Sequence, residues 1–172
     1  MLYQSHMKML SKYKFYLLII LFCLVNVHSA NSSTIPDEFH GKVTKVIDGD
    51  TIYVRNEKLG IVKIRLADID TPEIKQPYGM QAKKVLEKKL FKKKVKIRKI
   101  SIDRYKRVIG IVYKENLEIN HFLVINGHAW CYERYSERPI IKIAESIAKR
   151  KRLGLWKSEK AIPPWEWRKN RK

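Results

Sequence analysis

Two short acidic segments carry the residue types most suited to chemistry in this chain. The first runs from Asp48 to Thr51 and the second from Asp68 to Glu73. Carboxylates that are brought together raise one another's pKa unless a positive charge offsets them. Because the available donors are oxygens and the histidines lack zinc-type spacing, the donor set favours Ca²⁺. If the two segments converge, the residues therefore predict a calcium site.

The residues between the two segments predict that they converge. Apolar and polar residues alternate over 42–47, 51–54 and 61–69, with turns at Asp48-Gly49 and at 56–60. In such a meander the second strand starts beside the end of the third, so Asp50, Asp70 and Glu73 can meet at one rim. The plainer interpretation makes Asp48-Gly49 only a turn and Asp70 only the start of a loop. Asp50 favours the site, because it follows the turn and does not form it.

Arg65 adds a positively charged group to the same rim. It lies on the polar face of the strand that leads into the second acidic segment. A bound cation can neutralise a phosphate, an arginine can hold its oxygens and a carboxylate can activate water. The combination predicts phosphodiester chemistry. Asp48 and Asp68 are assigned turn or supporting roles, because one acid in each segment suffices.

The rest of the pattern predicts an α+β fold, a five-stranded OB-fold β-barrel with about three helices. Two further strands are expected at 94–102 and 107–113. Apolar residues at helical spacing indicate helices at 80–91, near 117–127 and from Pro139 to about Gly154. Five strands interrupted by one helix suit a small closed Greek-key barrel. Barrels of this type often bind single strands of nucleic acid.

The N-terminal segment has the pattern of a secretory signal peptide. Lysines precede an apolar run from Phe15 to Val27, and small polar residues follow it. Cleavage is expected after Ser29 or Ala30, which predicts a secreted or periplasmic protein without stable membrane association. An uncleaved anchor is the alternative, and translation can begin at any of three methionines, which are Met1, Met7 and Met9. The expected organisation is a signal peptide at 1–30, a flexible leader at 31–39, an OB-fold domain at 40–157 and a basic aromatic tail at 158–172.

Charge points to an anionic partner. The chain has 37 Lys and Arg against 17 Asp and Glu, a formal net charge of +20. Removal of residues 1–30 takes away three lysines and no acids, which leaves 34 against 17, or +17. Nucleic acid and anionic membranes are the usual counterparts of such a charge, although it can also serve solubility alone. After cleavage Cys131 is the one remaining cysteine, so no internal disulfide is expected.

Five motifs in order give the sequence a family resemblance. The stretches VIDGDT, RLADIDTPE, QPYG, DRYKR and GHAWCY resemble the thermonuclease family, the staphylococcal-nuclease-like domains, over roughly Phe39 to Trp156. The resemblance implies an OB barrel, one Ca²⁺ ion, and hydrolysis of DNA and RNA with little sequence specificity that leaves 3′-phosphate ends. It also fits a monomer. One departure is Lys106, where the family often has glycine.

The resemblance also implies roles for individual residues. Asp50 and Asp70 supply carboxylates to Ca²⁺, and Thr71 supplies its backbone carbonyl. Glu73 acts as general base on the attacking water. Arg65 and Arg107 hold the phosphate, and Arg107 is nearer the leaving oxygen. Arg104 and Tyr105 match positions near the other phosphate of the substrate, and either Tyr132 or Tyr135 stacks on a base.

A non-catalytic nucleic-acid-binding OB-fold module is the main alternative function. Such a module would not require the acids and arginines of a nuclease, and all of them are present in this chain. A basic protein anchored at a membrane surface is a third possibility, which gives the acidic rim no role.

Overall fold

Strands β1 (Glu38–Val46), β2 (Thr51–Asn56) and β3 (Gly60–Leu66) form an antiparallel meander. The computed structural model describes residues 34–170, so the predicted signal peptide at 1–30 and residues 31–33 of the predicted leader lie outside them. Contacts divide the chain into Met1–Thr34 and Ile35–Lys172, and the meander belongs to the second unit. The alternation of the sequence is clearest in β3, and a register shift in β1 between Val43 and Lys45 interrupts it.

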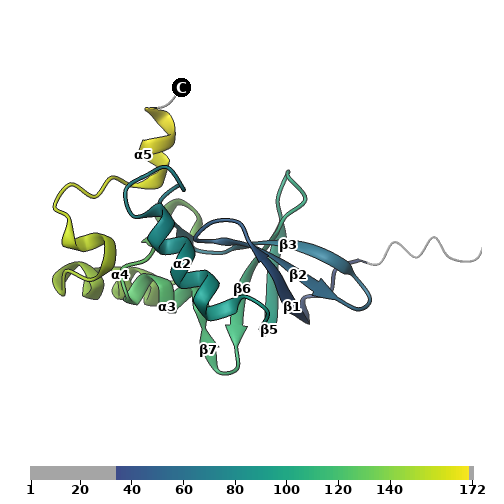
Figure 1. Ribbon diagram of the computed structural model, residues 1–172. Helices are drawn as coiled ribbons and strands as arrows, with labels where there is room; N and C mark the ends of the chain where they lie inside the picture. The colour runs from purple at the N-terminus through teal and green to yellow at the C-terminus, as the bar shows by residue number, and fades with distance from the viewer. Residues whose placement is uncertain (1–33, 171–172) are drawn as a thin grey trace, which may run out of the picture. The chain divides into compact units, whose positions relative to one another are not determined.

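Two further long strands close the sheet into a barrel (Figure 1). Strand β5 (Lys94–Ile102) pairs with β1, and β6 (Val108–Lys114) pairs with β5 and also in parallel with the end of β3. A short strand, β7 (Leu117–Glu118), extends the sheet beyond β6. The closure by β3 and β6 confirms the five-stranded OB-type barrel and leaves few open edges.

Three helices cover the barrel in the places that the sequence predicts. They are α2 (Gly79–Leu90), α3 (Ile119–Ile125) and α4 (Pro139–Arg150). Helix α2 turns Ala82, Leu86 and Leu90 inward, and none of the three is accessible to solvent. Burying a side chain such as leucine contributes about 1.5–3 kcal/mol. Among residues 34–170, no helix is long and apolar enough to cross a membrane.

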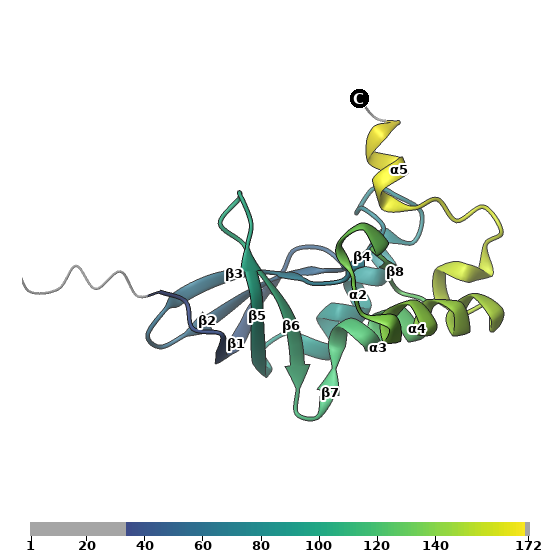
Figure 2. The ribbon, with the colours of Figure 1, turned by 180° about the vertical axis from the view of Figure 1, so that it is seen from behind.

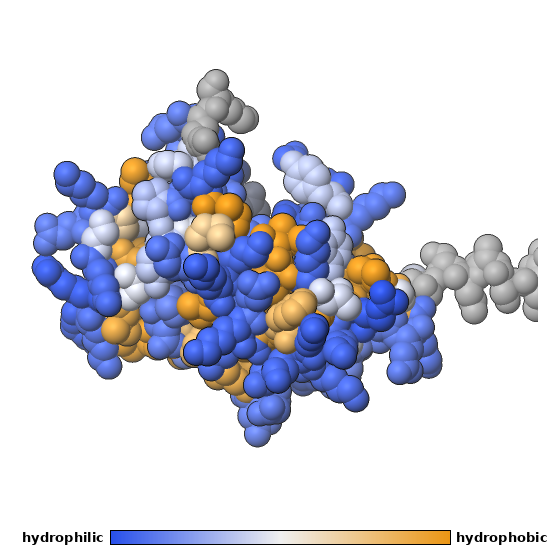
Figure 3. All heavy atoms as spheres, viewed as in Figure 1, coloured by the Kyte–Doolittle hydropathy of each residue, from blue (hydrophilic) through white to orange (hydrophobic). Residues whose placement is uncertain are grey.

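The core fills the barrel and continues under the helices. Its fully buried side chains include Val43, Ile52, Val54, Ile64, Leu66, Leu86, Leu90, Ile97, Val108, Val112, Ile119 and Leu123. The face seen in Figure 3 is mostly hydrophilic, with apolar residues in small separate areas.

The C-terminal segment, predicted only as a basic aromatic tail, contains a fourth α-helix. Two short 3₁₀ turns, η1 (Glu133–Tyr135) and η2 (Gly154–Lys157), lie on either side of α4. From η2 the chain turns back and forms α5 (Pro164–Lys169). Figures 1 and 2 show α5 on the side of the molecule that carries β4 (Ile69–Asp70) and β8 (Trp130–Cys131), a short antiparallel pair.

Candidate active site

The two acidic segments meet at one rim of the barrel. Strand register sets Thr51 opposite Arg65, so the start of β2 lies beside the end of β3. One carboxylate oxygen of Asp50 accepts hydrogen bonds from the backbone N–H and the hydroxyl of Thr71, both at 2.8 Å. A side chain at Gly49 would come within 2.6 Å of the Thr71 hydroxyl, so glycine permits this close approach. The segments are therefore joined through buried groups.

Arg65 joins the two aspartates that the sequence predicts as ligands. Its Nε lies 3.1 Å from Asp50 and its Nη2 lies 2.9 Å from Asp70. The other terminal nitrogen donates to the carbonyls of Leu66 and Ile69 at 2.6 and 2.8 Å. Asp50 and Asp70 are only 5 % and 2 % exposed, so the guanidinium offsets a repulsion that water screens poorly.

A second arginine, Arg168 from α5, contacts Asp70 and also Glu73. Nη2 of Arg168 lies 2.7 Å from Asp70, and Nη1 lies 2.8 Å from Glu73. Burial opposes the charge of this guanidinium, but its hydrogen bonds to the two carboxylates outweigh burial and raise the pKa of Arg168. The structure thus connects Glu73 to the aspartates through a residue that the sequence did not single out.

Burial raises the pKa of two acids at this rim, Asp70 and Asp48. It raises the pKa of Asp70, although Arg168 and Arg65 act in the opposite direction. Burial, reinforced by the charge of Asp50, raises the pKa of Asp48 to about 6. Asp48 accepts the backbone N–H of Asp50 at 3.0 Å, as a turn residue does. Asp68, which holds the corresponding position in the second acidic segment, forms an ion pair with Arg138 at 3.2 Å.

The loop that carries Glu73 is fixed at both ends. Its backbone N–H donates to the side chain of Gln76 at 3.0 Å. A side chain at Gly79 would lie 1.8 Å from the Glu73 carbonyl, so the start of α2 packs directly on this loop. The Glu73 carboxylate is still 41 % exposed, which leaves it accessible to water and substrate.

The turn between β5 and β6 lines the same cleft as the acidic rim. Asp103 accepts the backbone N–H groups of Tyr105 and Arg107 and pairs with the Arg107 guanidinium at 2.8 Å. Arg104 donates to the hydroxyl of Tyr105 at 2.8 Å. Lys106, in the position where glycine is frequent in the family, has a left-handed backbone with φ of 59°. The turn therefore forms without glycine, in a conformation that is strained for lysine.

One cleft of about 860 Å³ contains every residue that the sequence predicts for the site. Asp50, Asp70 and Thr71 lie on the wall formed by Arg65 and the Glu73 loop, and Arg107 lies on the wall formed by the β5–β6 turn. Tyr105 and Tyr135 are 63 % and 64 % exposed, so both rings are accessible to a substrate. Arg168 also lines this cleft.

The donor set of the cleft fits a hard cation. Asp50 and Asp70 contact one guanidinium, and Thr71, whose backbone carbonyl is the expected third donor, gives its N–H to Asp50. Within residues 34–170, no group of three or more His, Cys, Asp or Glu side chains is spaced to hold a metal. A cation here would thus use two carboxylates and would complete its coordination with backbone and water oxygens, as Ca²⁺ readily does.

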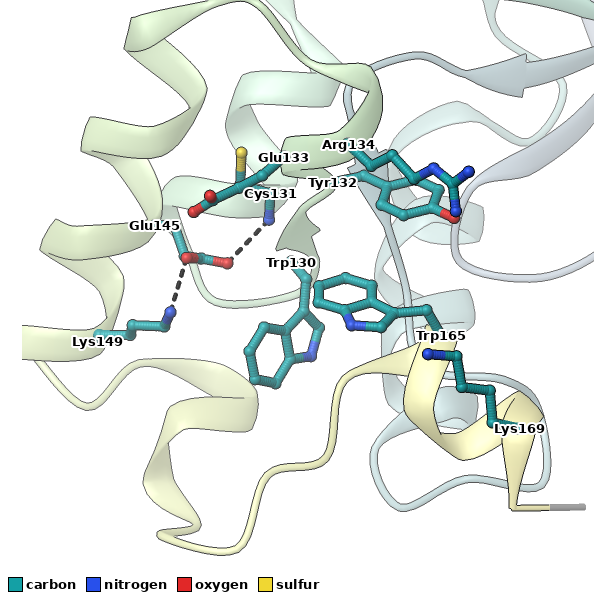
Figure 4. A pocket seen from close by; sticks show the side chains of 9 residues that line it. All are labelled: Trp130, Cys131, Tyr132, Glu133, Arg134, Glu145, Lys149, Trp165 and Lys169. Atoms are coloured by element: carbon teal, nitrogen blue, oxygen red, sulfur yellow. Dashed lines mark hydrogen bonds and ion pairs between the residues drawn. The ribbon is translucent and has the colours of Figure 1, made fainter.

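A second cavity, of about 450 Å³, lies between α4 and α5 (Figure 4). Its wall includes Glu145, which accepts the backbone N–H of Cys131 at 2.9 Å and pairs with Lys149 at 2.7 Å. Burial, with a smaller contribution from Glu145, raises the pKa of Cys131 to about 11. The buried thiol is therefore protonated at neutral pH.

The barrel and its cleft define a class of protein, an OB-fold protein with a polar site suited to phosphate. The family model described as "Staphylococcal nuclease homologue" matches residues 63–158. An uncharacterized endonuclease of Escherichia coli is 37 % identical over 132 residues, which cover 76 % of this chain and 86 % of that protein. A micrococcal nuclease of Shigella flexneri is 36 % identical over 143 residues, covering 77 % of this chain and 82 % of that protein. The chain belongs to the staphylococcal nuclease homologue family.

Proposed function

We propose that this protein is a Ca²⁺-dependent nuclease that hydrolyses phosphodiester bonds in DNA and RNA with little sequence specificity and leaves 3′-phosphate ends. One observation carries the proposal: a single cleft holds the buried Asp50–Arg65–Asp70 group, the accessible Glu73 and Arg107. Membership of the staphylococcal nuclease homologue family supports nuclease activity independently of this geometry.

The proposed mechanism gives the acids and the arginines of the cleft different roles. Asp50, Asp70 and the carbonyl of Thr71 would hold one Ca²⁺, which would supply positive charge to the phosphate. Glu73 takes a proton from the water that attacks phosphorus, a contribution worth roughly 10²–10⁴ in rate, and the bond to the 5′ oxygen breaks. Arg65 and Arg107 bind the phosphate oxygens and stabilise the charge that develops there. Phosphate contacts carry no base information, in keeping with low sequence specificity.

Digestion of matched substrates tests this function. Single- and double-stranded DNA and RNA of one sequence are incubated with the protein and Ca²⁺, and the product ends are identified by mass spectrometry. We expect cleavage of all of them at many positions, with 3′-phosphate ends. Products with 5′-phosphate ends would contradict the proposal that the 5′ oxygen is the leaving group. Tight nucleic-acid binding without any cleavage would instead favour the non-catalytic OB-fold module.

We also propose that the protein is exported and acts as a monomer, without stable membrane association after cleavage near residues 29–30. The basis is the lysine-flanked apolar run from Phe15 to Val27. The mass of the protein recovered from expressing cells gives the mature N-terminus, and light scattering gives its oligomeric state. A mature chain that retains the apolar run would contradict the cleaved signal.

A further inference from the structure

Helix α5 places a positive charge on two residues of the proposed catalytic machinery. Both terminal nitrogens of Arg168 contact Asp70, at 2.7 and 3.3 Å, and one also contacts Glu73 at 2.8 Å. Asp70 is a proposed calcium ligand and Glu73 the proposed base. A guanidinium in contact with both occupies space that a cation and its attacking water need.

The same helix covers an aromatic residue of the cleft. The ring of Trp165 stacks on that of Tyr132, with centroids 5.4 Å apart and planes inclined by 5°. Figure 4 shows the indole reaching from α5 toward Tyr132 and Trp130. The Trp130 ring meets it edge-on at 5.7 Å. Tyr132 is a predicted base-stacking residue, and Trp165 covers it with the near-parallel geometry that a nucleobase would adopt.

A third contact ties the segment before α5 to the loop of the general base. The side chain of Gln76 accepts the Glu73 backbone N–H at 3.0 Å and donates to the carbonyl of Ile162 at 2.6 Å. Gln76 is only 5 % exposed, so this link is shielded from water. It directs α5 across the cleft and not away from it.

Helix α5 buries few of its own residues completely. Pro164 is its one buried residue, and the Arg168 side chain remains 42 % exposed. Ion pairs with such exposure contribute little to stability, and segments with few buried contacts open at low cost. The contacts of α5 are thus specific in position but modest in strength.

From these contacts we propose that α5 is a displaceable cap on the active site. Arg168 supplies the positive charge that Asp70 and Glu73 need while no Ca²⁺ is bound, and Trp165 occupies the stacking face of Tyr132. Ca²⁺ and α5 compete for the same carboxylates, so each weakens the binding of the other by the same factor. This inference rests on the proposed function, because it assumes that Asp70 binds Ca²⁺.

Calorimetric titration of the full chain with Ca²⁺, without nucleic acid, tests the competition. Arg168→Gln removes the competing charge and is expected to bind Ca²⁺ roughly fivefold more tightly than the wild type, the change that matches one partly exposed ion pair. Trp165→Ala loosens the helix without touching a carboxylate and should change the affinity in the same direction. Arg152→Gln is the matched control, since Arg152 pairs with Glu159 on an exposed surface.

Hydrogen exchange provides a second readout that depends on no variant. Saturating Ca²⁺ should speed exchange of the backbone amides of α5 in the wild type, because the released helix loses its protection. Exchange at α2, whose buried side chains remain packed, should be unchanged.

Four results would overturn the cap. Equal or weaker Ca²⁺ binding by Arg168→Gln, together with slower DNA cleavage, would make Arg168 a phosphate-binding residue. Unchanged exchange in α5 on Ca²⁺ binding would show that the helix stays in place. If neither wild type nor variants bind Ca²⁺, the metal part of the proposed function fails and the competition fails with it. Ca²⁺-dependent cleavage with equal affinities would reject the cap alone.

Discussion

Glu73 occupies a different environment from the aspartates beside it. Its side chain is 41 % exposed, whereas the side chains of Asp50 and Asp70 are 7 % and 3 % exposed. Buried carboxylates with fixed partners suit charge binding, and an accessible carboxylate suits proton transfer to and from water. The proposed division of roles among the three acids follows from this difference.

Substitution of Glu73 by glutamine tests that division. Glu73→Gln keeps the size and polarity of the side chain but removes its basicity, so kcat should fall by roughly 10²–10⁴ while DNA binding is largely retained. Glu57→Gln, an isosteric change in the exposed β2–β3 turn, serves as the control. Single-turnover cleavage and fluorescence anisotropy measure the two quantities. Unchanged turnover would remove Glu73 from the role of base.

At the scale of elements, the β5–β6 turn combines strain with substrate-facing residues. Lys106 has a φ of 59°, a conformation that costs little only for glycine. Lys106→Gly should therefore raise the free energy of unfolding by about 0.5–1 kcal/mol, after allowance for the extra freedom of glycine in the unfolded chain. Urea denaturation measures the change. Lys106→Ala, which keeps the Cβ atom, should show no such gain, and equal stabilisation by both variants would refute the strain.

The contact between Tyr78, just before α2, and His128, after α3, predicts a pH dependence of stability. Their side chains meet at 2.9 Å, from the Tyr78 hydroxyl to Nδ1 of His128, and burial lowers the pKa of His128 from its ordinary value of 6.5. The unfolded chain therefore binds a proton that the native histidine resists. As the pH falls below about 6.5, this histidine should reduce the free energy of unfolding.

Denaturation at several pH values isolates this contribution. The fall in stability between pH 7.5 and about 5.5 should be smaller for His128→Gln than for the wild type. His40→Gln, a change at an exposed position of β1, should behave as the wild type does. An identical pH dependence in wild type and His128→Gln would contradict the buried neutral histidine.

The sequence predicts elements whose patterns lie among neighbouring residues, and it misses those that depend on contacts between residues far apart in the chain. Alternation over β1–β3 and helical spacing over α2 are properties of neighbouring residues, so the barrel and the meeting of Asp50 with Asp70 could be predicted. Helix α5 has six residues, too few for a periodic pattern, and follows two prolines. The contacts of Arg168 with Asp70 and Glu73 span 98 and 95 residues. No local pattern encodes such a contact, so Arg168 could not be predicted.

At the scale of the whole molecule, the net positive charge and the acidic cleft act on nucleic acid at different distances. The chain carries a formal charge of +20, yet the proposed cation ligands are acids set into one rim. Exposed lysines continue from α2 to the start of β5, namely Lys84, Lys88, Lys92, Lys93 and Lys94. The basic surface can attract the nucleic-acid backbone at long range, while the cleft acts on one phosphate at contact.

Salt should therefore weaken nucleic-acid binding steeply. For a single strand, each phosphate contact adds about −0.7 to the slope of log affinity against log salt. Four contacts would lower the affinity by roughly 50-fold between about 50 mM and 200 mM salt. Anisotropy with Glu73→Gln, without Ca²⁺, measures binding without cleavage. An affinity that hardly changes with salt would contradict recognition through the backbone.

Cleavage of one end-labelled DNA oligonucleotide, followed over time as Ca²⁺ is removed and returned, tests the proposed active site most directly. The Asp50–Arg65–Asp70 group predicts cleavage in Ca²⁺, its loss in excess chelator and its recovery when Ca²⁺ is added back. Cleavage that continues at full rate in excess chelator would contradict the metal-dependent centre.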